Sequence, residues 1–96
     1  MKMNWGPFMG DTSWRADTGR YTYLILTSAT PGSGITKLYE MPNSQPLCPI
    51  NSETASQYAE FGPSQYWRTM VAEARYHARM WAMERERSAD KALQER

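Results

Sequence analysis

The sequence has few of the residues that build metal and redox sites. Cys48 is its single cysteine and His77 its single histidine. An intramolecular disulfide is therefore excluded, as are cysteine-rich and multi-histidine metal sites. Cys48 lies in the stretch P-L-C-P-I, where we expect it to be buried as a small hydrophobic residue. We expect no metal and no cofactor, and a single unpaired thiol fits a reducing compartment.

The sequence also lacks an excess of charge and any long hydrophobic run. Eleven Lys and Arg against ten Asp and Glu leave a net charge of +1, so overall charge gives no reason to expect a nucleic-acid partner. A membrane-spanning helix needs about 18 apolar residues in succession, and no segment approaches this. The first ten residues include Gly and Pro and no apolar run, unlike a signal peptide. We therefore expect one small cytoplasmic domain over 1–96 without membrane contact.

Motifs for catalysis are missing as well. His77 is the only histidine available to a catalytic triad, and its neighbour Glu73, one helical turn earlier, is unremarkable. No G-x-S-x-G nucleophile elbow occurs, and Asp11 and Asp17 fall in an expected loop without acid–base geometry. A single histidine in an amphipathic helix is usually a packing residue. We expect the protein not to be an enzyme.

The stretch A-T-P-G-S-G-I-T, residues 29–36, partly matches the G-x-x-x-x-G-K-[ST] pattern of a phosphate-binding loop. Ile35 stands where that loop needs the lysine that reaches the terminal phosphates. Pro42 then ends the following segment too soon for the helix whose N-terminus would hold a phosphate. The stretch instead predicts a hairpin loop, with turn geometry supplied by Pro31, Gly32 and Gly34.

The first half of the chain predicts a β-hairpin. Residues 20–27, R-Y-T-Y-L-I-L-T, are dense in β-branched and aromatic side chains, and residues 35–41, I-T-K-L-Y-E-M, are the expected partner strand. We therefore assign a hairpin to 20–41. Residues 1–19 are expected to form an N-terminal arm, loop or short edge segment with apolar anchors at Trp5, Phe8 and Trp14. Residues 42–51 are expected to form a proline-rich loop.

The second half predicts two helices. Ser52 suits the N-cap and Gly62 the C′ position of a short helix over 52–61. From residue 64 onward there is no Gly or Pro, and Ala, Met, Glu and Arg abound, which predicts a long helix over 64–96 with a charged end. The expected fold class is α+β, with a small antiparallel hairpin or sheet packed against this long C-terminal helix.

The long helix has two apolar faces. At about 100° per residue, one stripe should lie against the sheet, weakly extended by Ser88 and Ala92. This stripe consists of Trp67, Met70, Val71, Ala74, Ala78 and Trp81. Nearly opposite lie Tyr76, Met80 and Met83, an apolar patch that needs a cover. That cover is either the N-terminal arm or a second protein chain.

Three arginines follow one edge of the helix, beside the second apolar patch. Arg68, Arg75 and Arg79 could contact phosphate with Tyr76 stacking on a base, or form a solvated edge over Tyr and Met side chains. We favour the solvated edge, because the net charge is close to zero and glutamates are interspersed.

Together these features indicate a non-enzymatic protein-binding module that acts by occupying a partner's surface. Its expected partner-binding residues are Tyr76, Met80, Met83, Arg68, Arg75 and Arg79. Small proteins without motifs are frequent among phage-encoded inhibitors of host complexes, such as anti-CRISPR proteins, and among assembly subunits. The alternatives are a nucleic-acid-binding accessory protein using the arginine edge, and a structural subunit of a larger assembly such as a virion. The sequence leaves the oligomeric state open.

Overall fold

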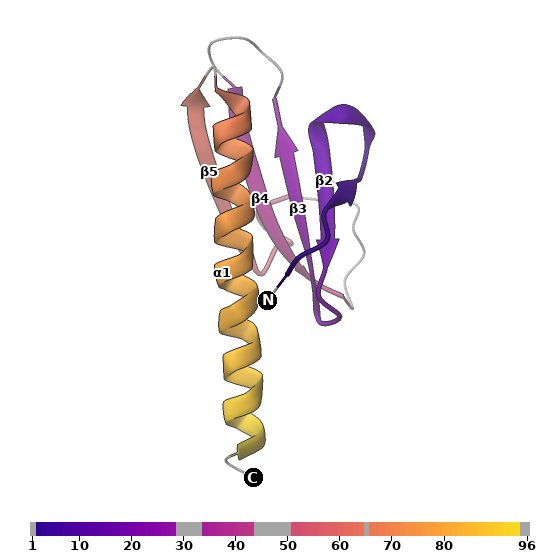
Figure 1. Cartoon of the computed structure of the whole chain (residues 1–96), viewed down its shortest axis with the longest axis vertical. Helices are drawn as coiled ribbons and strands as arrows, with labels where there is room; N and C mark the ends of the chain where they lie inside the picture. Colours follow the sequence, from indigo (N-terminus) through magenta and orange to yellow (C-terminus); the bar gives the residue numbers. More distant parts are fainter. Residues whose placement is uncertain (1, 29–33, 44–50, 65, 95–96) are drawn as a thin grey trace.

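A computed structural model describes residues 2–28, 34–43, 51–64 and 66–94. It shows the expected α+β architecture, with a five-stranded antiparallel sheet packed against one long C-terminal helix (Figure 1). The strands lie in the order β1-β2-β3-β4-β5, so each strand pairs with its neighbour in the sequence. The elements are β1 (Gly6–Pro7), a 3-10 turn η1 (Gly10–Thr12), β2 (Ser13–Asp17), β3 (Tyr21–Thr27), β4 (Gly34–Pro42), β5 (Gln57–Ser64) and α1 (Trp67–Gln94).

The predicted hairpin is confirmed as β3 and β4. The two strands pair antiparallel, with Leu24 opposite Tyr39 and Ile25 opposite Leu38. Strand β4 begins at Gly34, within the 29–36 stretch, so this stretch leads into a strand and not into the helix that a phosphate-binding loop requires. The loop prediction concerned Pro31, Gly32 and Gly34. Pro31 and Gly32 lie outside the described residues, as does Cys48 of the proline-rich loop, and Gly34 is the first residue of β4.

The predicted short helix over 52–61 is wrong, because its first half forms a turn and a bend and its second half belongs to strand β5 (Gln57–Ser64). Residues 52–54 form a turn before β5. Asn51, not Ser52, caps this turn, since its Oδ1 accepts hydrogen bonds from the backbone N–H groups of Glu53 (2.8 Å) and Thr54 (3.0 Å). The chain then pairs with the free edge of β4, and its side chains alternate between the two faces of the sheet. Tyr58 packs on the face away from α1, and Phe61 packs on the face beneath α1.

The N-terminal region is more regular than predicted. Residues expected to form an arm or loop include β2, which pairs with β3 along its whole length. The turn before β2 is closed by Ser13, whose hydroxyl accepts from the Met9 N–H (2.7 Å) and lies 2.9 Å from the Met9 carbonyl oxygen. The three expected anchors do pack against the core. Trp5 and Trp14 lie on the α1 side of the sheet, and Phe8 lies on the other side.

Helix α1 is confirmed and crosses the sheet over β3, β4 and β5. Its buried residues are Val71, Ala74, Ala78 and Ala82, whose small side chains let the helix backbone approach the sheet closely. Val71, Ala74 and Ala78 were expected there. The larger members of the expected stripe lie at its margins, because the close approach of α1 to the sheet leaves room only for small side chains at the centre. Met70 and Trp81 are half-buried, and Trp67 is 41% exposed.

The sheet divides the buried side chains into two clusters. Under α1, Tyr23, Ile25 and Leu38 pack against the helix alanines. On the opposite face, Leu24, Tyr39 and Met41 form a second cluster with Phe8, Leu26, Ala55 and Tyr58 at its margin. The C-terminal part of α1 projects beyond the sheet (Figure 1), and the described chain extends 51 Å along its longest axis.

Candidate binding surface on helix α1

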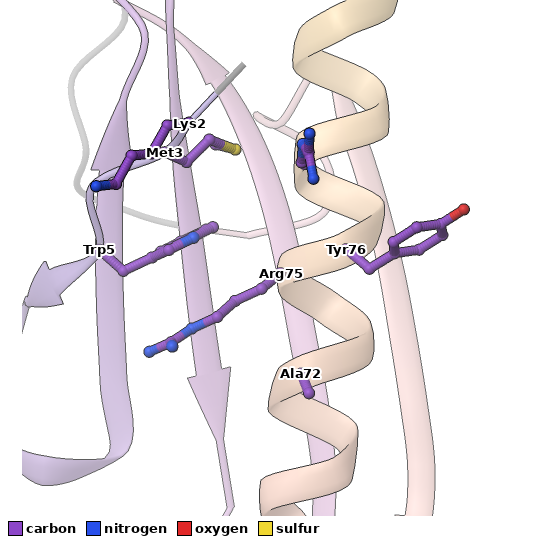
Figure 2. A pocket seen from close by; sticks show the side chains of 7 residues that line it. Lys2, Met3, Trp5, Ala72, Arg75 and Tyr76 are labelled. Atoms are coloured by element: carbon purple, nitrogen blue, oxygen red, sulfur yellow. The ribbon is translucent and has the colours of Figure 1, made fainter.

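The outer face of α1 presents large apolar side chains to solvent. Tyr76 is 61% exposed, Met80 is 45% exposed and Met83 is half-buried. Of the two expected covers, the N-terminal segment leaves Tyr76 and Met80 open, because it lies beside the helix. Figure 2 shows Tyr76 projecting away from Trp5 and Met3. The outer patch, defined as Tyr76, Met80 and Met83, therefore stays accessible.

Two of the three arginines along the edge of α1, Arg68 and Arg75, lie against tryptophan rings. The Arg68 guanidinium lies 5.3 Å from the centroid of the Trp67 ring. Trp67 in turn stacks on Trp14, with 6.3 Å between the ring centroids and 12° between the planes. The Arg75 guanidinium lies 5.7 Å from Trp14 and 5.8 Å from Trp5. These five side chains form a cation–aromatic stack that joins α1 to β2 and to the N-terminal segment.

This stack explains why the N-terminal segment and β2 stay docked. Helix α1 makes its main contacts with β3, β4 and β5, so the side of the sheet nearest β1 needs another cover. The Arg75 guanidinium supplies it by lying against both Trp5 and Trp14 (Figure 2 shows Trp5 beside Arg75). Among the described residues it makes no ion pair, and its buried Nε–H lacks a hydrogen-bond partner. Its attraction to the ring faces is therefore its main tertiary contact.

We expect Arg75→Ala to lower the free energy of unfolding by about 1–2 kcal/mol, through loss of two cation–π contacts and of stem packing. Arg75→Met keeps most of the apolar part of the side chain and removes an unpaired hydrogen-bond donor, so it should lower the free energy of unfolding by less than Arg75→Ala does. Urea unfolding followed by circular dichroism measures both. An alanine variant within about 0.5 kcal/mol of the parent chain, the range typical of surface substitutions, would show that the stack does not stabilise the fold.

Beside the stack, an open pocket of about 480 Å³ lies between the N-terminal segment and α1. Three cationic side chains line it, with aromatic and small residues between them, and no acidic residue is present (Figure 2). The lining residues are Lys2, Met3, Trp5, Ala72, Arg75, Tyr76 and Arg79. Two of the three arginines expected at the partner surface, Arg75 and Arg79, thus line the same pocket as Tyr76, whereas Arg68 lies with Trp67.

A buried ion pair, absent from the sequence-based expectations, joins α1 to the sheet. Glu40 in β4 is fully buried, and its Oε1 lies 2.6 Å from Nη2 of Arg85. The Tyr23 hydroxyl donates to Oε2 (2.7 Å) and the Ser56 hydroxyl lies 2.7 Å from Oε1. The Arg85 guanidinium also lies 4.8 Å from the Tyr21 ring. A charged residue one turn beyond Ala82, on the buried stripe, was the signal that could have revealed this pair.

The electrostatics of this network favour the ionised carboxylate. Burial raises the pKa of the Glu40 carboxyl, but hydrogen bonds from Arg85, Ser56 and Tyr23 and the charge of Arg85 outweigh burial, so the pKa lies below its ordinary value. Burial and the hydrogen bond to Glu40 raise the pKa of the Tyr23 hydroxyl. A carboxylate surrounded by donors in this way is poorly suited to accept a substrate proton. Its evident role is to attach α1 to the sheet.

Other residues considered for catalysis lie apart. His77 is exposed on α1, with its ring 5.1 Å from that of Phe61 and 5.8 Å from that of Tyr76. Asp17 stabilises a turn, since its Oδ1 accepts from the Gly19 N–H (2.8 Å) and from the Asn43 amide (3.2 Å). Over residues 2–28, 34–43, 51–64 and 66–94, no group of three or more His, Cys, Asp or Glu side chains is placed to hold a metal ion.

Two further findings bear on function. No helix in the described part of the chain has both the length and the apolar character needed to cross a bilayer. Comparison with protein-family models, curated proteins and solved structures found no match.

Proposed function

We propose that this protein is a non-enzymatic protein-binding module that acts by occupying a partner's surface through the outer face of α1. The observation that supports this most directly is the exposure of Tyr76 and Met80 on a helix whose opposite face already packs on the sheet. Aromatic and methionine side chains are enriched at interface centres, and an apolar helix face can fit into a groove of a partner. An inhibitor of a host complex, including a phage-encoded one, would need no chemistry beyond such a surface.

The partner's complementary surface should be acidic around an apolar centre. Arg79 and Lys2 lie on one side of the outer patch, in a pocket without acidic residues. Like charges across an interface are unfavourable, so a basic partner surface would be rejected there. The nucleic-acid alternative is less well supported, because Arg68 lies over Trp67 and outside the pocket that Arg75 and Arg79 line, so the three arginines do not form one row of free cations.

Site-specific photocrosslinking in the cells that make the protein tests this proposal. A photoreactive phenylalanine at position 80 should yield a defined protein adduct, and the same group at Glu53, an exposed turn residue, should not. Competition with unlabelled chain should remove the adduct. Competitor carrying Met80→Glu should be at least tenfold weaker, equivalent to about 1.4 kcal/mol, because it places a charge at the centre of an apolar contact.

Met80→Glu is expected to leave the fold intact, because the side chain is 45% exposed and surface substitutions change stability by about 0.5 kcal/mol or less. Circular dichroism and thermal unfolding check this. Equal adducts from positions 80 and 53, or competition unchanged by Met80→Glu, would reject the outer patch as a partner surface. Adducts to nucleic acid that vanish steeply with added salt would favour the accessory-protein alternative instead.

A further inference from the structure

The pocket between the N-terminal segment and α1 has the make-up of an anion site. It brings together one lysine and two arginines from two separate segments, Lys2 from the N-terminal segment and Arg75 and Arg79 from α1. Neither Arg75 nor Arg79 is in an ion pair with any described residue. Cations brought together without a counter-charge repel one another, and an anion bound between them relieves that repulsion.

The geometry around Arg75 favours a planar anion. The Arg75 guanidinium carbon lies 5.8 Å from the centroid of the Trp5 ring and 5.7 Å from that of Trp14, and these contacts hold the guanidinium beside the pocket. Its buried Nε has no hydrogen-bond partner among the described residues. An arginine held in this way has already lost much of its rotamer freedom, so less entropy is lost when a ligand binds. The forked edge of a guanidinium matches a carboxylate through two parallel hydrogen bonds.

The surroundings of the pocket favour a protein ligand over a polyanion. Tyr76 lines the pocket, and its ring projects away from Trp5 into the outer patch (Figure 2), so an apolar side chain of the ligand can pack on Tyr76 while a neighbouring carboxylate enters the pocket. A nucleic acid would need cations along an extended path, whereas α1 beyond Arg79 alternates in sign, with Glu84, Arg85, Glu86 and Arg87 in succession.

We propose that this pocket binds a glutamate or aspartate carboxylate of an acidic partner segment whose neighbouring apolar residue packs on Tyr76. The inference rests on the proposed protein-binding function and adds the chemistry of the partner. Carboxylate recognition by the pocket sets which acidic segments fit. Apolar contact with Met80 and Met83 extends the interface along the helix.

The test uses the full chain labelled with ¹⁵N and a capped peptide, acetyl-Glu-Leu-Glu-Glu-Leu-Glu-amide, as the probe. Titration should shift the indole N–H signal of Trp5, identified with Trp5→Phe, in a saturable manner. A matched peptide with glutamine in place of glutamate should bind at least tenfold more weakly. Arg79→Gln should weaken binding of the acidic peptide at least fivefold, because Arg79 lines the pocket.

Arg87→Gln is the matched control, since Arg87 is an exposed arginine on the same helix, outside the pocket, and is expected to change binding less than twofold. Equal weakening by Arg79→Gln and Arg87→Gln would mean non-specific attraction and would overturn the proposal. So would the absence of a saturable shift. Tighter binding of an oligothymidylate of eight nucleotides than of the peptide, with the same residues shifted, would assign the pocket to phosphate instead.

The two proposals fail separately. If the peptide does not bind but Met80→Glu abolishes partner crosslinking, the outer patch is a partner surface and the carboxylate pocket is wrong. If the peptide binds as expected but Met80→Glu leaves crosslinking unchanged, the pocket is correct and the outer patch is not the interface.

Discussion

Replacing Arg85 with methionine is expected to lower the free energy of unfolding by about 3 kcal/mol at neutral pH, the lower end of the range for breaking a buried ion pair. Glu40 is fully buried, so loss of its cationic partner leaves an uncompensated charge beneath α1. The Arg85 side chain is 35% exposed, which is why the lower end applies. Methionine keeps most of the apolar stem, so packing loss contributes little. Urea unfolding followed by circular dichroism measures the effect.

The control is the double variant Glu40→Gln/Arg85→Met, compared with each single variant. A neutral glutamine at position 40 can still accept hydrogen bonds from Tyr23 and Ser56. The double variant should therefore be more stable than Arg85→Met alone by about 1 kcal/mol or more, because it contains no buried unpaired charge. Additive effects within about 0.5 kcal/mol would mean that the two residues are not coupled.

The same pair should make stability depend on pH in a defined direction. The pKa of Glu40 in the folded chain lies below its ordinary value, so the folded state releases this proton more readily than the unfolded state. The stabilisation is therefore complete above the ordinary carboxyl pKa and is lost as pH falls through the lower, folded value. The deficit of Arg85→Met should shrink over that acid range. A deficit unchanged down to about pH 3, below the ordinary glutamate pKa, would indicate lost packing instead of lost charge.

Gly62→Ala is the second substitution with a large expected effect, at least about 3 kcal/mol of unfolding free energy, since strained backbone and steric overlap add together. Gly62 has a φ of +104°, a region that residues with a Cβ rarely adopt. A Cβ there would lie 2.7 Å from the Gly34 carbonyl oxygen and 3.1 Å from the Ser64 nitrogen. Both are backbone atoms, so no side chain can rotate away to relieve the contact.

Gly19→Ala separates the two causes. Gly19 also has a positive φ, +92°, but a Cβ there would meet nothing within 4 Å. Gly19→Ala should lower the free energy of unfolding by about 1–2 kcal/mol, because it introduces only the unfavourable backbone conformation. Thermal or urea unfolding of both variants gives the comparison. A Gly62→Ala variant no less stable than Gly19→Ala would contradict the close approach of β5 to Gly34.

Local patterns were sufficient to predict the elements whose partners are near in sequence. The β3–β4 hairpin and α1 follow from side-chain alternation and from a long run without Gly or Pro. Strand β5 could not be found in this way, because a capping-like Ser52 and the spacing of Ala55, Tyr58 and Ala59 also fit one face of a helix. Pairing with the edge of β4 decides its conformation, and that is a tertiary effect. Gly62 was expected at the C′ position of the predicted short helix, and it instead lies within β5 with a φ of +104°.

For the candidate site too, helical spacing predicted some features and missed those that depend on residues distant in the sequence. Helical spacing alone placed Tyr76 and Met80 opposite the sheet, and both are exposed there. The same spacing placed Arg75 on a free edge, because nothing in the helix itself shows that Trp5 and Trp14 reach its guanidinium. The Glu40–Arg85 pair joins residues 45 positions apart, and no local pattern connects them.

The connection order of the fold also determines when its core becomes covered as the chain is synthesised. The five strands of the described sheet all precede α1, so every residue of the sheet has been synthesised before Trp67, the first residue of the helix. Until α1 arrives, the face holding Tyr23, Ile25 and Leu38 has only the N-terminal segment to shield it, and Glu40 has no cationic partner. A ribosome-bound chain that stops at β5 would therefore expose apolar surface suited to chaperone binding.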